Sequence, residues 1–444
     1  MASLSEMAPP EKRRFAAFGS RNFRLYFVGQ TISSIGSWTH ALAVTWLVLE
    51  LTNRSDRLGI TMALQFLPLL LLGAPAGVLA DRFDNRRILV STSVVSGLLA
   101  ATFAVVASTG RITIWWIYAL TLVLGLAVAV ERPAMQAVLF ELVGPELLPS
   151  AVATNSTIAS VSRLIGPAVA GALIATVGVE ACFIVNAVSY LVVIAALLAL
   201  RSSELVHRPA IGSARGKLRE GFAYVRTHRN AARPLLVMSI VGTVAYNFPT
   251  TFPSMVRFGF HRGAGSVGIA MSVSAIGSIL GGIYIAGIKP HQRRTLAIAL
   301  TGFAAACLAL AVTPGFWPFA AMSISLGFAS ASFQSVNTVV LQQATEPSMQ
   351  GRVMALHQMA LFGTTPIGAL LVGWIIQVTS PRVPFALGGS PHWPAPPPST
   401  AAVVRRPTSR TKRTCPPHPF APPTHHLPQP RPAPGSTDQK ADLP

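Results

Sequence analysis

One arginine in the sequence stands where a charge is costly. Arg163 is about midway along the apolar stretch 151–178. A guanidinium in apolar surroundings must face a polar cavity or a partner, so it is a candidate functional group. Two interpretations are open. Arg163 holds an anionic group of a small molecule or responds to a proton-driven change nearby, or helix carbonyls or Asn155 satisfy it and it serves packing.

Three further side chains could carry a proton within or beside apolar stretches. Glu50 and Glu131 lie near the ends of such stretches, and His40 lies farther in. Histidine changes charge near neutral pH, and a carboxyl group does so when its surroundings favour the neutral form. We therefore predict that His40, Glu50 and Glu131 are the candidates for proton coupling. Each of them can equally be a structural or interfacial group.

A short charged hinge separates two long apolar stretches near residue 84. An acid at a helix end can accept hydrogen bonds from the free amides of a neighbouring helix start, and nearby arginines can hold it there. We predict that this loop does mechanical work; a loop kept charged only to obey membrane topology is the alternative. The hinge residues are Gly77, Asp81, Arg82, Arg86 and Arg87.

Polar and aromatic side chains in the apolar stretches form another set. Polar groups point inward because hydrocarbon does not solvate them, and many of them join helices by hydrogen bonds. Some, together with nearby aromatic rings, could line an amphipathic substrate cavity at the midplane, although packing or lipid contact is the alternative. The predicted cavity residues are Gln30, Trp38, Gln65, Phe66, Tyr246, Asn247, Phe248 and Asn337.

Composition places these residues in a membrane protein. The 444 residues are 51% hydrophobic and 11% charged, with a mean hydropathy of +0.52, which a soluble fold cannot bury. The net charge of +20 is spread over short loops, so we expect no nucleic-acid partner. No phosphate-binding loop, metalloprotease helix or nucleophile elbow occurs, and the cysteine spacing fits neither disulfides nor a metal. We predict no enzyme, no cofactor and no metal site.

Apolar runs between charges and turn formers predict eleven membrane-spanning helices and an all-α fold. Basic residues number 21 in the segments on one side of these helices and five on the other. This bias predicts a multi-pass protein of the inner (plasma) membrane with a cytoplasmic N-terminus. The predicted spans are 27–49, 58–80, 88–109, 112–130, 151–178, 181–200, 235–256, 265–288, 295–313, 316–341 and 353–379.

Two internal echoes divide the chain into halves. Gly59-Ile60-Thr61-Met62-Ala63 returns as Gly268-Ile269-Ala270-Met271-Ser272, and Gly166-Pro167-Ala168-Val169-Ala170 is answered by Thr365-Pro366-Ile367-Gly368-Ala369. Duplicated six-helix halves are a recurrent transporter plan. Within the central loop, 216–225 reads as an amphipathic helix at the membrane interface or as a solvated linker. The predicted organisation is a cytoplasmic segment 1–22, a six-helix half 23–200, a central loop 201–234, a five-helix half 235–379 and a tail 380–444.

The repeat predicts a twelfth helix near 380–399 that the sequence cannot form. From 381 onward the chain carries 18 of its 35 prolines, and we expect a disordered, basic tail. Eleven spans would place this basic tail outside, against the bias of the other loops. We therefore hypothesise that a frame change or gene-model error after about Ser380 removed the twelfth helix. A natural Pro-rich extension is the alternative.

Several motifs in the sequence resemble those of a known family. The hinge is similar to the loop signature of the major facilitator superfamily, and Gly166-Pro167-x-x-x-Gly171 is similar to its antiporter signature. Wider segments such as 23–30 and 132–137 resemble its transmembrane secretion effectors, a branch of effluxers related to the enterobactin exporter. Asp84 and Asn85 depart from the loop signature, which usually has glycine and a basic residue there.

The resemblance implies the major facilitator fold and alternating access, with the hinge as a latch between the halves. It also implies an antiporter-like motif of Arg163, Gly166, Pro167 and Gly171, where a bent, closely packed helix suits a rocking interface. We expect a monomeric secondary active exporter of small amphipathic or siderophore-like molecules in the lipid bilayer, with proton coupling as an option. An importer of a small solute and a non-transporting truncated membrane protein are the alternatives.

Overall fold

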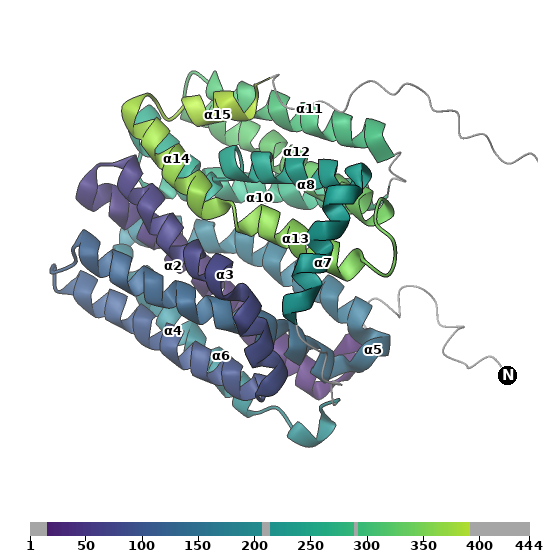
Figure 1. The fold of residues 1–444 in the computed structure, drawn as a ribbon. Coiled ribbons are helices and arrows are strands. Elements are labelled where there is room, and N and C mark those ends of the chain that lie inside the picture. Colours follow the sequence, from purple (N-terminus) through teal and green to yellow (C-terminus); the bar gives the residue numbers. More distant parts are fainter. Residues whose placement is uncertain (1–15, 207–213, 288–291, 391–444) are drawn as a thin grey trace, which may run out of the picture. The chain divides into compact units, whose positions relative to one another are not determined.

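The computed structural model describes residues 16–206, 214–287 and 292–390, and this part of the chain contains helices and no strand. It belongs to a compact unit, Met1–Pro396; a second unit, Pro397–Pro444, lies outside the described residues. The predicted disordered tail therefore lies largely outside them too. The all-α fold class is confirmed (Figure 1).

The first half of the bundle begins with a short 3₁₀ helix, η2 (Ala16–Gly19). Its long helices are α2 (Arg21–Thr52), α3 (Ser55–Arg82), α4 (Asn85–Ser108), α5 (Ile114–Thr176) and α6 (Val179–Leu198). A 63-residue helix would be about three times as long as a bilayer crossing if it were straight. Gly144 instead turns the chain, with φ of 69°, a conformation that glycine adopts without strain. Accordingly α5 contains the predicted fourth and fifth spans.

The second half follows a 3₁₀ turn, η3 (Ser202–Glu204), and the helix α7 (Ala214–Thr227). Two of its crossings are broken, the first at Asn247 and the second near Gly363. Within the described residues, ten helices or joined helices are long and apolar enough to cross a membrane; with α5 counted twice, they account for the eleven predicted spans. The elements are α8 (Arg229–Val244), α9 (Phe248–Ser254), the π-helix η4 (Met255–Gly259), α10 (Ala264–Ala286), α11 (Gln292–Ala311), α12 (Phe316–Gln343), α13 (Gln350–Phe362), α14 (Thr365–Val378) and α15 (Val383–Gly388).

The two halves meet along two seams, where α3 packs on α14 and α5 packs on α10. Both seams are made of small residues. A Cβ on Gly59 would collide with the Ala369 carbonyl, and one on Gly268 with the Pro167 carbonyl. Each echo of the sequence thus packs against the other echo across the bundle, which explains why both repeats contain glycine. Close backbone approach of this kind is typical of membrane helices.

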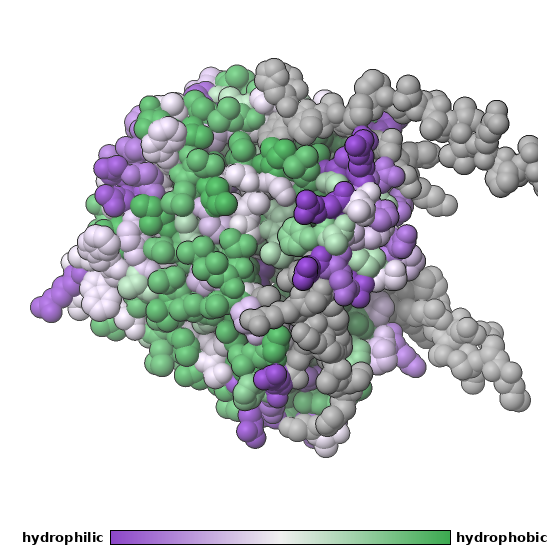
Figure 2. All heavy atoms as spheres, viewed as in Figure 1, coloured by the Kyte–Doolittle hydropathy of each residue, from purple (hydrophilic) through white to green (hydrophobic). Residues whose placement is uncertain are grey.

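The bundle has two ends, which we name by their loops. The Asn53 end holds the loop after α2, where Asn53 has a left-handed backbone and ends the helix. The Phe83 end holds the hinge between α3 and α4. Between these ends the surface is apolar: Leu71, Leu98 and Ile283 are each at least 64% exposed. Figure 2 shows hydrophobic residues across the middle and hydrophilic ones toward the two ends, as expected when the bilayer is the solvent.

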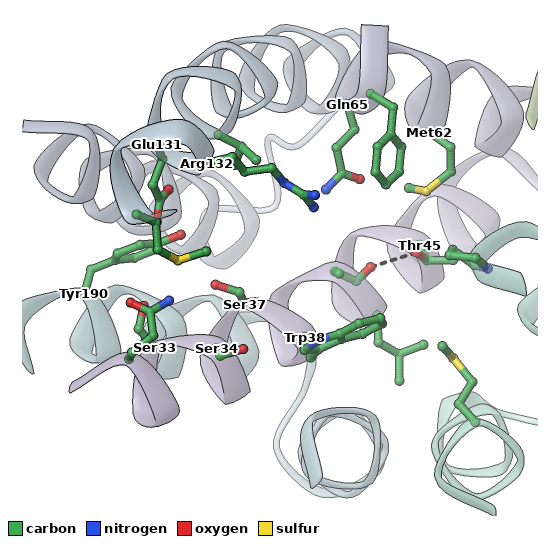
Figure 3. Close-up of a pocket in the computed structure, with 18 of the residues that line it drawn as sticks. Ser33, Ser34, Ser37, Trp38, Thr45, Met62, Gln65, Glu131, Arg132 and Tyr190 are labelled. Carbon is green, nitrogen blue, oxygen red and sulfur yellow. Dashed lines mark hydrogen bonds between the residues drawn. The ribbon is translucent and has the colours of Figure 1, made fainter. Parts of the chain in front are cut away.

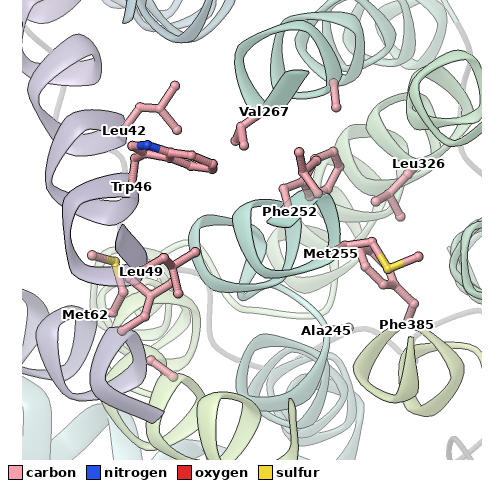
Figure 4. Close-up of a cluster of buried hydrophobic side chains, with 14 of the residues drawn as sticks. Leu42, Trp46, Leu49, Met62, Ala245, Phe252, Met255, Val267, Leu326 and Phe385 are labelled. Carbon is pink, nitrogen blue, oxygen red and sulfur yellow. The ribbon is translucent and has the colours of Figure 1, made fainter. Parts of the chain in front are cut away.

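A hydrophobic cluster joins the halves near the Asn53 end. Figure 4 shows Leu42 and Trp46 of α2 on one side and Phe252 and Val267 of the second half on the other. All four side chains are buried. This packing fixes the halves in one arrangement at that end.

The segment that we expected to begin the disordered tail is partly helical, so that boundary was wrong. Residues 383–388 form α15, which has a proline in its first turn, where a missing N–H breaks no helical hydrogen bond. Phe385 is 3% exposed and meets the rings of Phe252 and Phe319 at 6.0 and 5.8 Å. Arg382 donates to the Ala311 carbonyl over 2.9 Å. One buried ring therefore orders a segment that composition alone assigned to disorder.

Candidate functional site

A cavity of about 310 Å³ lies between the halves. Most of its wall comes from α2, α3 and α5, and a smaller part from α6, α9 and α10. Four of the predicted cavity residues line it: Gln30, Trp38, Gln65 and Phe66. The remaining lining residues are Ser33, Ser34, Ser37, Ala41, Leu42, Thr45, Met62, Val128, Glu131, Arg132, Met135, Tyr190, Pro249, Pro253 and Met271.

The cavity is closed toward the Asn53 end by hydrogen bonds between the halves. The Ser55 N–H donates to the Gln377 side-chain oxygen over 3.0 Å, and the Ser55 and Ser254 hydroxyls lie 3.0 Å apart. The Ser272 hydroxyl donates to the Leu164 carbonyl over 2.8 Å. The small-residue seams also lie toward the Asn53 end of the bundle. Together these contacts make a closed gate on one side of the cavity.

Glu131 and Arg132 place opposite charges on one wall. Adjacent residues of a helix point in different directions, and Figure 3 shows Glu131 beside Tyr190 while Arg132 extends toward Gln65. The Arg132 guanidinium lies 4.9 Å from the ring centre of Phe362 in the other half. No described ion pair joins Glu131 to a base. The wall therefore offers a carboxyl group that no described ion pair occupies, beside a cation that contacts both halves.

Arg163 extends this polar surface. Its guanidinium lies 5.6 Å from the ring centre of Trp38, which lines the cavity. The residue is exposed, and among the described residues no carboxylate lies within the 4 Å of an ion pair. Gly166, one turn along α5, packs directly on Trp38. The glycine brings the helix close to Trp38 and so places the Arg163 cation over the ring.

The other four predicted cavity residues do not line this cavity. Tyr246 donates to the Ser330 carbonyl over 2.6 Å and stacks on Phe303 in the second half. Phe248 packs beside Tyr246. Asn247, at the break between α8 and α9, donates to the Thr243 carbonyl at the end of α8. Asn337 is buried and hydrogen-bonds His357 over 3.2 Å.

Two of the three proton-coupling candidates also lie elsewhere. His40 is 4% exposed and is edge-on to Phe103 and Phe183, and neither ring nitrogen has a hydrogen-bond partner among the described residues. Glu50 lines a second cavity of about 610 Å³ at the Asn53 end, together with Glu180. Of the three candidates, Glu131 is the one that the structure places in the central cavity.

The hinge joins helices of the first half. The Arg86 guanidinium donates to the carbonyls of Leu197 and Leu198 at the end of α6, each over 2.8 Å. Asp84 accepts from the Arg86 and Arg87 amides and so caps α4. Asn85 donates to Glu141 over 2.8 Å. The two residues that depart from the loop signature thus have their own structural roles.

The remaining hinge residues make fewer contacts. Arg82 is exposed, and Arg87 lies 3.5 Å from the exposed carboxylate of Asp84. A Cβ on Gly77 would meet nothing within 4 Å. The side chain of Asp81 lies outside the described part of the structure, and the predicted latch rests chiefly on that residue.

Several lining residues escaped the sequence analysis. Ser33, Ser34, Ser37 and Arg132 face the cavity beside the predicted residues. Ser34, Ser37 and Ala41 follow the i, i+3, i+7 spacing of one helix face that also includes Gln30 and Trp38, and that spacing was the signal that could have found them.

Two helical halves that meet along small-residue seams, and enclose a mixed polar and aromatic cavity closed at one end, make up the major facilitator fold. The nucleoside transporter NupG has this fold, with a TM-score of 0.67 at 13% identity over 83% of this chain and 96% of that one. The chain belongs to the transmembrane secretion effector family, whose model matches residues 12–392. The predicted family is thereby confirmed, and the protein is not an enzyme.

Two relatives cover most of the chain. Macrolide efflux protein A of Streptococcus pyogenes is 24% identical over 79% of this chain and 88% of its own length. The staphyloferrin A transporter of Staphylococcus aureus is 26% identical over the same shares of the two chains. The chain is thus a multi-pass membrane protein of a transporter family.

Proposed function

We propose that this chain exports small amphipathic molecules across the plasma membrane by alternating access. The central cavity carries the proposal: aromatic rings, hydroxyls and charged groups lie between two halves that are closed at one end. Trp38 and Phe66 suit apolar parts of a substrate, and the Arg163 and Arg132 cations suit an anionic group. The relatives named for macrolide efflux and for staphyloferrin A support this class, which includes siderophore-like compounds.

The orientation follows from charge. Basic residues gather at the Phe83 end, which we assign to the cytoplasm. The cavity would then be closed on the outer side, in the state that receives a substrate from inside. A compound from the cytoplasm can enter the cavity in this state, and its release on the other side of the membrane is export. We assign the proton-carrying step to Glu131, because it faces the cavity and has no described ion-pair partner.

The substrate site is tested by exchanging a cavity tryptophan for alanine. Trp38→Ala removes the ring that faces both the cavity and Arg163, and we expect substrate binding to weaken about tenfold. The matched control is Trp374→Ala, because Trp374 of α14 is 60% exposed on the bundle surface. Purified protein is screened by fluorescence against macrolides, siderophores and lipophilic cations, and hits are followed as efflux in proteoliposomes. Equal loss in both variants would contradict the cavity as the binding site.

A further inference from the structure

The helix α7 in the central loop has two different faces. In Figure 1 it runs across the long helices instead of along them, at the Phe83 end. One face is docked on the second half: Glu220 lies 3.0 Å from the Arg352 guanidinium, and the Tyr224 hydroxyl accepts from the Glu346 amide over 3.2 Å. A Cβ on Gly221 would already touch Arg352 at 3.3 Å. These contacts fix which side of α7 faces outward.

The outward face carries an aromatic ring between two arginines. Arg219, Phe222, Ala223 and Arg226 are all exposed, and Phe222 is 54% exposed. Their i, i+3, i+4, i+7 spacing puts them on one stripe of the helix. Neither guanidinium lies within 4 Å of a carboxylate belonging to a described residue. The only acid on this part of α7, Glu220, is occupied by Arg352, so the stripe is purely cationic.

This combination has a specific physical partner. A large ring left in water is unfavourable, but at a membrane surface it enters the boundary between headgroups and acyl chains. Arginines on either side of it can then form charge-assisted hydrogen bonds to phosphate oxygens. The position of α7 suits this contact, because it lies crosswise where the long helices end. Figure 2 shows hydrophilic residues near α7 beside the hydrophobic flank of the bundle.

We propose that Arg219, Phe222 and Arg226 form a docking site for the anionic phospholipid headgroups of the bilayer surface. The stripe anchors α7 to the membrane, and through Glu220 and Tyr224 it anchors the second half at the Phe83 end. Among the described helices, α8 and α13 of the second half and α3 of the first half pack on α7, and the packing against α13 is the most extensive. The lipid surface therefore holds one half more firmly than the other. This inference is independent of the transported substrate.

The test places a fluorophore within the stripe. Ala223→Cys, in a Cys415→Ser background, is labelled with nitrobenzoxadiazole; Cys182 and Cys307 are buried. The full chain is reconstituted in nanodiscs that contain equal fractions of phosphatidylglycerol and phosphatidylcholine, and one of the two lipids carries a headgroup-proximal spin label that quenches the fluorophore. We expect stronger quenching by spin-labelled phosphatidylglycerol. Local enrichment of this lipid should fall about fivefold in Arg219→Ala and in Arg226→Ala.

The matched control removes an exposed arginine from the opposite end. Arg111→Ala should leave the enrichment unchanged. Equal quenching by the two lipids would overturn the proposal, because the stripe would then select no anionic headgroup. Absence of quenching by either lipid would show that the stripe faces water or another protein. Enrichment that persists in both arginine variants would also overturn it.

Discussion

At the scale of single residues, an acid and a base occupy consecutive positions of the cavity wall, but their side chains point in different directions. Glu131 lines the cavity beside Tyr190 of the first half, whereas Arg132 reaches Phe362 of the second half. A charge that contacts both halves responds to their relative movement. A neighbouring carboxyl group without a described ion pair can gain or lose its proton as that movement changes its surroundings.

The role assigned to Glu131 can be tested by an isosteric change. Glu131→Gln keeps the shape of the side chain but cannot release a proton. We expect transport driven by an imposed pH gradient to fall to background in proteoliposomes, while exchange of labelled for unlabelled substrate at equal pH continues. Glu50→Gln, in the second cavity, serves as the control and should retain both activities. Retained gradient-driven transport in Glu131→Gln would exclude this residue as the proton carrier.

The hinge arginines should differ in their effect on stability. Arg86 donates to two carbonyls of α6, and charged hydrogen bonds of this kind are each worth about 1.5–3 kcal/mol, less where water competes. Arg86→Ala should therefore lower the melting temperature of the purified protein. Arg87→Ala is the control, because that side chain is 88% exposed and should leave the melting temperature unchanged. The same melting temperature for both variants would argue against the α4–α6 tie.

Some residues could be assigned from sequence and others could not. Gln30, Trp38 and Glu131 were found because a polar or aromatic group in an apolar stretch is costly or conspicuous. Tyr246 and Phe248 are also aromatic residues in an apolar stretch, but they face the interior of their own half. The direction in which a helix points its side chains is set by packing partners that are distant in the chain. The contact of Arg86 with Leu197 joins positions 111 residues apart and leaves no local pattern.

At the scale of elements, α10 contains one of the repeated sequence segments, and this segment packs in a seam between the halves. Its glycines face different surroundings: Gly268 touches the backbone of α5, whereas a Cβ on Gly282 would meet nothing within 4 Å. Eleven crossings could be predicted because each is a long apolar stretch. The helix α15 could not, because it depends on the buried ring of Phe385 instead of hydropathy. The breaks at Asn247 and Gly363 are each followed by a proline, Pro249 or Pro366, in the first turn of the next helix, a local signal that a search for apolar stretches does not use.

The seam predicts different outcomes for the same substitution in one helix. Gly268→Ala would force α10 away from α5 and should destabilise the closed Asn53 end by about 1–3 kcal/mol, the usual range for overpacking. Gly282→Ala should be neutral. Spin labels on α5 and α10 near the Asn53 end, measured by pulsed electron resonance, should show a longer distance in Gly268→Ala alone. Equal distances in the two variants would contradict a tight seam.

At the scale of the whole molecule, eleven crossings have a topological result. An odd number places the start of α2 and the end of α14 on opposite sides of the membrane. With α15 following α14 at the Asn53 end, the described chain ends on the side that we assign to the exterior. The missing-helix hypothesis remains a prediction that sequencing of the locus would test.

The orientation itself can be measured by labelling cysteines in intact cells. Phe83→Cys and Arg111→Cys place thiols at exposed positions of the two ends, in the Cys415→Ser background. A membrane-impermeant maleimide should label Arg111→Cys in intact cells. It should label Phe83→Cys only after the cells are permeabilised. The reverse pattern would invert the assignment and would turn the proposed loading state into one open to the exterior.

The seams between the halves and the wall of the cavity place different constraints on the sequence. The halves touch at Gly59, Gly268 and their partners largely through main-chain atoms, which are the same for every amino acid. The cavity, in contrast, is lined by side chains of α2, α3 and α5 whose exchange leaves those main-chain contacts in place. A scaffold of this kind can acquire a new cargo by changing a few wall residues while its moving joint is preserved. Directed evolution toward a chosen compound should therefore start from the wall and leave the glycines untouched.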